Sequence, residues 1–297
     1  MASLPEAVRQ HLETKYGTPL AIERLGGMSG GRVYRVRCPG RSVVVKGTSR
    51  PWEVDFYRAV APALAQRGVA TPALEWSGQD GATWWLVLED VPHPLPQARW
   101  LADPELLAML RRLHASAIPH APERPGAYRP AWTPGMTGAA LSLLSGPVAR
   151  RLAPLLESIR GAHPHLFAPR CPISGDPNPL NWGLRDDGTL VLYDWERFCY
   201  GTPALDLAIT VPGLGDAAAF HRVAATYLRA ARAESRPTER APRDTVEQLA
   251  RDIAAAKVWT MVEFLGLAAS GAVRGGVPIE ALVGRFPDWV RQVAEGR

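Results

Sequence analysis

The hydrophobic pattern of the chain changes once, close to residue 90. Before that point, short alternating or β-branched runs such as RVYRVR (32–37) are separated by glycine turns, which predicts antiparallel strands. From residue 101 onward, apolar residues recur mostly at helical spacing. The sequence therefore predicts an α+β chain of two lobes: a small β-rich lobe over residues 1–90 and a larger, mainly α-helical lobe over residues 91–297.

The sequence predicts three helices with defined bounds. Residues 5–16 are expected to form an opening helix, and residues 52–67 a second one in spite of Pro62. Residues 139–160 are expected to form a single helix.

The composition is that of a folded globular protein, with 46% hydrophobic and 21% charged residues. The net charge is +5, but the basic residues are spread over both lobes, so we expect no nucleic-acid partner. No run of 18 apolar residues occurs, and we expect no membrane association. The cysteines Cys38, Cys171 and Cys199 are scattered, and the N-terminus lacks a hydrophobic signal core, which favours a cytoplasmic location.

Lysine is scarce in this chain. Lys15, Lys46 and Lys257 are the only lysines among 34 basic residues. The simplest explanation of this imbalance is a coding preference for arginine, and each retained lysine is a candidate for a position where the two side chains are not interchangeable.

A local excess of acids contrasts with the positive charge of the chain. Residues 174–206 hold six acidic residues against two arginines. Asp176 is followed five residues later by Asn181, and Asp194 follows after a predicted strand hairpin. Phosphoryl transfer needs a carboxylate at the attacking hydroxyl and oxygen ligands for Mg²⁺ on the nucleotide phosphates. The hairpin would return the second acid to the first loop, so the segment is a candidate cation and phosphoryl-transfer site.

The same segment resembles the aminoglycoside phosphotransferase and choline kinase superfamily, small-molecule relatives of protein kinases. The resemblance rests on SGDPNPLN (174–181), YDWE (193–196) and YGTPALDLA (200–208), and it extends over roughly residues 20–210. It implies a protein-kinase-like two-lobed fold and an ATP-dependent kinase that uses Mg²⁺. The γ-phosphate would be transferred to a hydroxyl of a small metabolite or antibiotic.

The resemblance also assigns roles to five residues of this segment. Asp176 would be the catalytic base, and Asn181 and Asp194 would be metal ligands. Asp206 would brace the catalytic loop, and Glu196 would assist the metal or the acceptor.

One position of the motif departs from the family pattern, because Ser174 stands where the family usually has histidine. That histidine supports the loop, so the substitution predicts altered bracing with activity retained. It also leaves open a second class of function, a nucleotide-binding pseudokinase or regulatory module. The absence of HRD, DFG and APE-type segments argues against a protein kinase.

The nucleotide site is expected in the first lobe. The glycine turn LGGMSGGRV is neither a GxGxxG motif nor a Walker loop, since Arg32 and Val33 replace Lys-Ser/Thr. By the resemblance it would cover the nucleotide phosphates, with Ser29 nearest to them. Lys46 would contact the phosphates and pair with Glu53. The backbone from Glu89 to Val91 would hold the adenine.

The acceptor is a small hydroxyl compound whose identity the sequence leaves open, as it does the oligomeric state. The DWE triplet also occurs in choline, ethanolamine and thiamine kinases, which makes such an acceptor the alternative to an aminoglycoside. Trp132 and Trp259 are candidates for lining the acceptor pocket. His114 is expected to be a packed structural residue.

Overall fold

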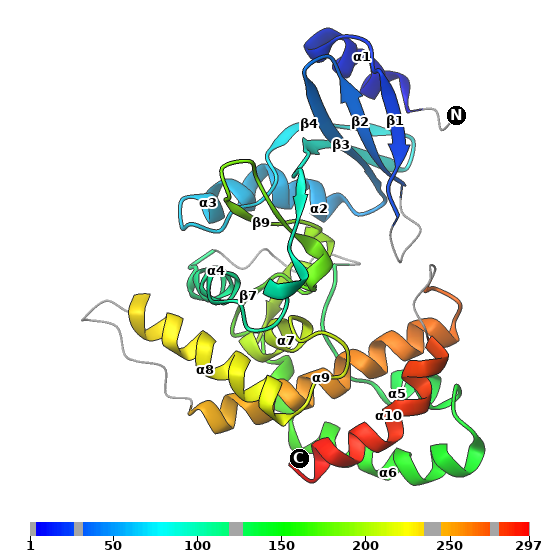
Figure 1. Cartoon of the computed structure of the whole chain (residues 1–297). Coiled ribbons are helices and arrows are strands. Elements are labelled where there is room, and N and C mark those ends of the chain that lie inside the picture. The colour runs from blue at the N-terminus through cyan, green and yellow to red at the C-terminus, as the bar shows by residue number, and fades with distance from the viewer. Residues whose placement is uncertain (1–3, 27–31, 119–126, 235–244, 274–278, 297) are drawn as a thin grey trace.

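The computed structural model describes residues 4–26, 32–118, 127–234, 245–273 and 279–296. A β-sheet lies at one end of the molecule and the long helices lie at the other (Figure 1). The predicted α+β architecture is thereby confirmed. In chain order the elements are α1 Glu6–Tyr16, β1 Ala21–Arg24, β2 Arg32–Cys38, β3 Arg41–Thr48, α2 Pro51–Asp55, η1 Phe56–Val60, α3 Ala61–Ala65, β4 Leu74–Asp80, β5 Thr83–Glu89, β6 His93–Pro94, η2 Gln97–Arg99, α4 Pro104–Ala115, α5 Pro134–Leu141, α6 Gly146–Ala162, η3 Pro164–Phe167, β7 Cys171–Ile173, η4 Pro179–Asn181, β8 Trp182–Leu184, β9 Leu190–Leu192, η5 Trp195–Arg197, β10 Cys199–Gly201, α7 Pro203–Ile209, α8 Ala217–Glu234, α9 Val246–Ala269 and α10 Ile279–Ala294.

The N-terminal sheet is antiparallel, with strand order β1-β2-β3-β5-β4. Successive β5 side chains face opposite sides, as the period of two requires. Trp85 and Val87 pack in a small core that includes α1 residues, whereas Leu86 and Leu88 belong to the main core that continues into the helical lobe. The sheet is therefore covered on both faces, and one face anchors it to the rest of the chain.

The helix predicted over residues 52–67 is interrupted by one turn of wider pitch. It consists of α2, the π-helical turn η1 and α3, and the amide of Ala61 donates to the carbonyl of Phe56. Pro62 has no N–H and cannot continue the regular hydrogen-bond ladder, so the wider turn precedes it. Phe56 in this turn stacks on Trp195 of η5, with 4.5 Å between the ring centroids.

The single helix predicted over residues 139–160 is wrong, because the structure has two helices, α5 and α6, in this region. Ser145 has extended backbone angles at the start of α6, and Pro147 in its first turn has no N–H to donate. The opening helix predicted over residues 5–16 is present as α1.

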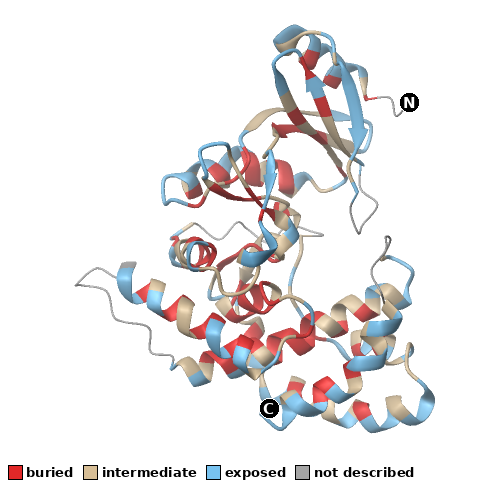
Figure 2. Cartoon of the chain, in the orientation of Figure 1, coloured by how far each residue is buried: buried red, intermediate tan, exposed pale blue. Residues whose placement is uncertain are grey.

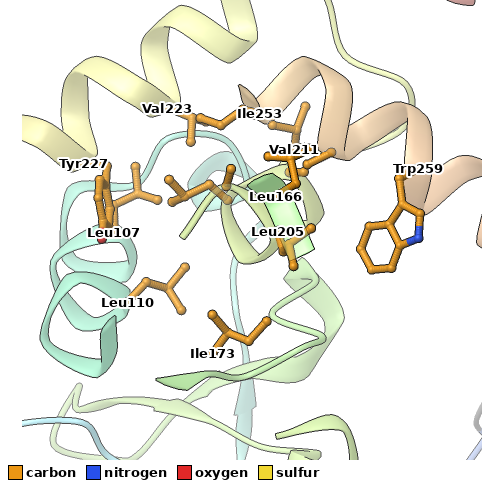
Figure 3. Packing of buried hydrophobic residues seen from close by; sticks show 14 of the residues in the cluster. Leu107, Leu110, Leu166, Ile173, Leu205, Val211, Val223, Tyr227, Ile253 and Trp259 are labelled. Carbon is orange, nitrogen blue, oxygen red and sulfur yellow. The ribbon is translucent and has the colours of Figure 1, made fainter. Parts of the chain in front are cut away.

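The helical lobe is built around one apolar core to which α4, α7, α8 and α9 contribute (Figure 3). Leu107 and Leu110 of α4 face Val223 and Tyr227 of α8 and Leu205 of α7 in this core. In α4 and α8 the buried residues lie on the inner side and the exposed residues on the outer side, whereas α7 has no exposed residue (Figure 2). No helix in the described part of the chain is long and apolar enough to cross a membrane.

Two small sheets carry the segment 174–196, which holds the candidate residues Asp176, Asn181 and Asp194. β7 pairs with β10, and β8 pairs with β9 on one side and β6 on the other. Since β6 directly follows the sequence that leaves the N-terminal sheet, the β8–β9 hairpin is attached to the segment that joins the two lobes.

Candidate active site

The loop that carries Asp176 leaves β7 through a glycine that no other residue could replace without strain. Gly175 has a φ of +79°, and a Cβ on this residue would collide with the backbone carbonyl of Arg197. The amides of Ser174 and Gly175 donate to the two carboxylate oxygens of Asp206, at 2.8 and 2.9 Å. Asp206, which is fully buried on α7, therefore braces the loop directly in front of Asp176.

The brace is extended by His114 of α4, which is buried. Its Nε2 lies 3.1 Å from Oδ2 of Asp206, and its Nδ1 lies 2.9 Å from the hydroxyl of Tyr227. Ser174 is buried too, and its hydroxyl accepts a hydrogen bond from the amide of Asp176 at 3.3 Å. Histidine is thus absent from position 174, but a histidine from another helix supports the same acid.

Asp176 is part-buried within the loop that follows. Asn178 donates to its Oδ1 at 2.9 Å, and Nδ2 of Asn181 donates to its backbone carbonyl at 2.9 Å. Burial raises the pKa of Asp176 to about 6, while the Asn178 hydrogen bond and the positive charge of Arg197 oppose that rise. The group remains a carboxylate at neutral pH and is a stronger base than an exposed aspartate.

The β8–β9 hairpin brings Asp194 back to this loop, as the spacing of the two acids predicted. The amide of Tyr193 donates to the carbonyl of Asn181 at 3.0 Å, which fixes the two segments side by side. Asp194 has a left-handed φ of 64°, a conformation that costs free energy in a residue other than glycine. Such strain is common at functional sites, where the surrounding structure imposes it.

Lys46 reaches this site from β3 of the N-terminal sheet. Its Nζ lies 2.7 Å from Oε1 of Glu53 and 2.6 Å from Oδ1 of Asp194. Glu196 lies further away, with its Oε2 at 3.8 Å. Burial alone would lower the pKa of Lys46, but the carboxylates of Asp194, Glu53 and Glu196 together raise it. The lysine is therefore charged and joins the two lobes, and the predicted pair with Glu53 is present.

The oxygens beside Asp176 fit the Mg²⁺ ion that the resemblance implies. Because Nδ2 of Asn181 faces a carbonyl, its side-chain oxygen is left for a cation, and Asp194 adds a carboxylate that is 38% exposed. No cluster of three or more His, Cys, Asp or Glu side chains in the described residues could hold a metal. This donor set suits Mg²⁺, which binds one or two protein groups and completes its shell with water and phosphate oxygens.

Glu196 links the lobes at a second point. Its carboxylate accepts from Arg50 at 2.7 Å, and its backbone carbonyl accepts from the indole of Trp52 at 3.1 Å. Arg50 directly precedes α2 and Trp52 lies in its first turn, so the start of α2 is linked to Glu196, two residues after Asp194.

The predicted adenine-binding segment lies at the end of β5, but the Glu89 side chain is engaged elsewhere. Its carboxylate binds Arg185 through two hydrogen bonds, at 2.6 and 2.8 Å, which lowers the pKa of Glu89. Its amide donates to the carbonyl of Ala73. Val91 lies against Gly183 of β8. Ser29, the residue predicted nearest the phosphates, lies outside the described residues.

The two tryptophans expected in an acceptor pocket are interior residues instead, so that prediction is wrong. Trp132 and Trp259 are 7% and 2% exposed. The indole of Trp132 donates to Thr137 and that of Trp259 to the carbonyl of Ala131, both at 2.9 Å. Their N–H groups are satisfied inside the fold, and these contacts hold α5 and the preceding segment against α9.

Sequence reasoning missed a cluster of three side chains beside Asp176. It consists of Arg197 of η5, Tyr128 of the segment after α4, and Glu263 of α9. The three come from distant parts of the chain, so no spacing could connect them. The one signal was Glu263, the only charged residue in the stretch VWTMVEFLGLAA (258–269) of α9.

Two cavities, of about 600 and 360 Å³, lie among the C-terminal helices. They are lined by residues of α6, α8, α9 and α10, and neither includes Asp176, Asn181, Asp194 or Lys46. The site is therefore located by its convergent chemical groups rather than by the size of a cavity.

Comparison with solved structures identifies proteins of the same overall fold. Spectinomycin phosphotransferase APH(9)-Ia, solved with ADP and spectinomycin, superposes with a TM-score of 0.65 at 11% identity, over 100% of both chains. A thermostable mutant of aminoglycoside phosphotransferase APH(4)-Ia, in a ternary complex with AMP-PNP and hygromycin B, gives 0.63 at 14% identity over 98% of both chains. Choline kinase LicA from Streptococcus pneumoniae gives 0.58 at 15% identity over 98% of both. These likenesses show a shared fold.

The comparison with curated protein sequences found no match. The sequence does match the model of the Phosphotransferase enzyme family over residues 21–244, which is well over half of its 297 residues. This stretch includes the Lys46–Glu53 pair, the catalytic loop, the hairpin and the Asp206 brace. The chain belongs to the phosphotransferase enzyme family.

Proposed function

We propose that this phosphotransferase transfers the γ-phosphate of ATP to a hydroxyl group of a small molecule. The observation that carries the proposal is the meeting of Lys46, Asp194, Asn181 and Asp176, through contacts of 2.6 to 3.0 Å, at the junction of the two lobes. A cation, a potential base and two oxygen ligands are the groups that phosphoryl transfer requires.

Each group has a distinct task in this proposal. Asp176 orients the acceptor hydroxyl and accepts its proton as the oxygen attacks the γ-phosphorus. Lys46 is held by Glu53 and contacts the α- and β-phosphates. Asn181 and Asp194 would hold Mg²⁺, whose chemistry is to neutralise the charge that develops on the phosphoryl oxygens.

The remaining predicted residues would support these groups. Backbone atoms between Glu89 and Val91 would hold the adenine, and the turn that contains Ser29 would cover the phosphates. Glu196 keeps Arg50 at the site, and Asp206 keeps the catalytic loop in place. Ser174 stands where the family usually has a histidine that supports the loop. In this chain Asp206 and His114 support the loop instead, which favours catalysis over a purely regulatory, nucleotide-binding role.

The test is Mg-ATP turnover with a panel of hydroxyl acceptors, measured as acceptor-dependent ADP release. Asp176→Asn should reduce kcat by at least about a hundredfold and leave ATP binding intact, because the base would be lost while the phosphate-binding groups remain. The control is Asp186→Asn, which changes an acid in the β8–β9 turn whose side chain is 89% exposed. An Asp176→Asn protein with wild-type turnover would exclude the proposed base. ATP binding without transfer to any acceptor would favour the regulatory role.

A further inference from the structure

Arg197 is the residue directly after the DWE triplet, and it lies against the catalytic loop. Its backbone carbonyl and Cβ border Gly175, the residue before Asp176. Its positive charge also counters the effect of burial on the pKa of Asp176. The side chain is 22% exposed, and its contact with Gly175 and its charge interaction with Asp176 put it on the side of the loop where we expect the acceptor of the proposed reaction to present its hydroxyl.

The guanidinium of Arg197 is held by two partners at once. Its Nη2 lies 2.5 Å from Oε1 of Glu263, and its central carbon lies 4.0 Å from the centroid of the Tyr128 ring. The hydroxyl of Tyr128 donates to the same Oε1 at 3.1 Å. The planar cation thus covers an aromatic face and neutralises a carboxylate.

A carboxylate and an aromatic face are the two groups that proteins use to bind an ammonium ion. At this site Arg197 occupies both. The other acid at the edge of the site, Glu196, is paired with Arg50 at 2.7 Å. An acceptor with an ammonium group beside its reacting hydroxyl would have to displace Arg197, or bind next to it despite the repulsion between the two positive charges.

A guanidinium has five N–H donors and no acceptor, so it favours ligands rich in oxygen. With Nη2 on Glu263, Arg197 retains further donors for a hydroxyl or carboxylate of the acceptor. We propose that Arg197 is the acceptor-specificity residue, which selects neutral or anionic polyhydroxyl compounds over ammonium compounds. The inference rests on the proposed function, because it presumes that the acceptor binds next to Asp176.

The first test uses acceptors that share a ring and differ in charge: glucose, glucuronate and glucosamine, together with choline and its uncharged isostere 3,3-dimethylbutan-1-ol. Binding is measured by calorimetry with Mg-AMP-PNP present, and transfer is measured as ADP release. We expect the neutral and anionic members to bind at least about tenfold more tightly than the ammonium members, which is about 1.4 kcal/mol. Preference for the ammonium members, or binding of none of the five, would overturn the inference. Selective binding without transfer would instead count against the proposed function alone.

The second test removes the cation while keeping the length of the side chain. Arg197→Met exposes Glu263 and the Tyr128 ring, so it should shift the ratio of ammonium to neutral acceptor affinity by about tenfold toward ammonium, with KM for ATP unchanged. Adding Glu263→Gln should reverse most of that shift. Arg151→Met, at an exposed arginine on α6, is the matched control. An unchanged ratio in a folded Arg197→Met protein would refute the role. If that variant does not fold, Arg197→Gln, which also removes the positive charge, should show the same shift.

Discussion

Replacing Lys257 with methionine should stabilise the protein and remove a pH dependence that the wild type shows. Lys257 lies in the middle of α9, is 4% exposed, and donates to the carbonyl of Val211 at 2.6 Å. Burial lowers its pKa to about 7, and no charged group in the part of the chain that the structure describes opposes that effect. Methionine has a similar length, carries no charge and suits a helix interior.

The expected size of the effect follows from proton linkage. The folded protein holds the amine mostly neutral above about pH 7, whereas the unfolded chain keeps its proton up to a pKa of 10.5. The unfolded state therefore binds more protons in this interval, and the stability of the wild type rises with pH. From these two pKa values the rise amounts to about 2 kcal/mol between about pH 6 and pH 8.5. At pH 6 the variant avoids about 4 to 5 kcal/mol of penalty and loses one hydrogen bond of about 1 to 2 kcal/mol, a net gain of about 3 kcal/mol.

The assay is urea unfolding followed by tryptophan fluorescence at several pH values across this interval. The quantity compared is the difference in unfolding free energy between wild type and variant, in which the titration of groups common to both cancels. Lys15→Met serves as the control, because Lys15 is exposed on α1 and this variant keeps Lys257, so its pH profile should be parallel to that of the wild type. Parallel pH profiles for the wild type and Lys257→Met would refute the reasoning, since they would mean that Lys257 titrates alike in both states.

Three further predictions concern the proposed catalytic loop and Lys46, the lysine that we propose binds the phosphates. Asp206→Asn should lower the free energy of unfolding by about 3 kcal/mol, because an amide N–H₂ would face a backbone N–H; thermal unfolding measures this. Gly175→Ala should reduce both stability and kcat, whereas Gly188→Ala, which has a similar φ of +83° but open space around it, should cost only about 1 to 2 kcal/mol and leave kcat unchanged. Lys46→Met should raise KM for ATP at least about tenfold, measured by steady-state kinetics; an unchanged value would exclude the phosphate contact.

The parts of the site that the sequence predicted are those in which short-range spacing determines geometry. Asp176 and Asn181 are separated by one short loop, and a tight hairpin necessarily returns Asp194 to that loop. The Lys46–Glu53 pair spans only a turn between β3 and α2. In each case the chain is too short between the two groups to place them elsewhere.

The parts that escaped prediction depend on contacts between distant segments. Residue type alone suggested aromatic pocket walls at Trp132 and Trp259, but whether an indole faces a cavity or the core is decided by neighbours such as Thr137 and the Ala131 carbonyl. The bracing of Asp206 by His114 likewise joins α4 to α7, across 92 positions of sequence.

The two buried lysines explain why an arginine-rich chain keeps lysine at all. Lys46 concentrates its charge on one nitrogen that lies 2.6 and 2.7 Å from two carboxylates and 3.8 Å from a third, a convergence on one point that a wide planar guanidinium cannot reproduce. Lys257 has no carboxylate partner among the described residues, and it can remain buried because an amine can lose its proton whereas a guanidinium stays charged. One site therefore requires the compact charge of lysine and the other its capacity to become neutral. At Lys15, which is exposed and pairs with Glu75 beside Arg41, neither property is needed, and there the choice of lysine has no structural reason.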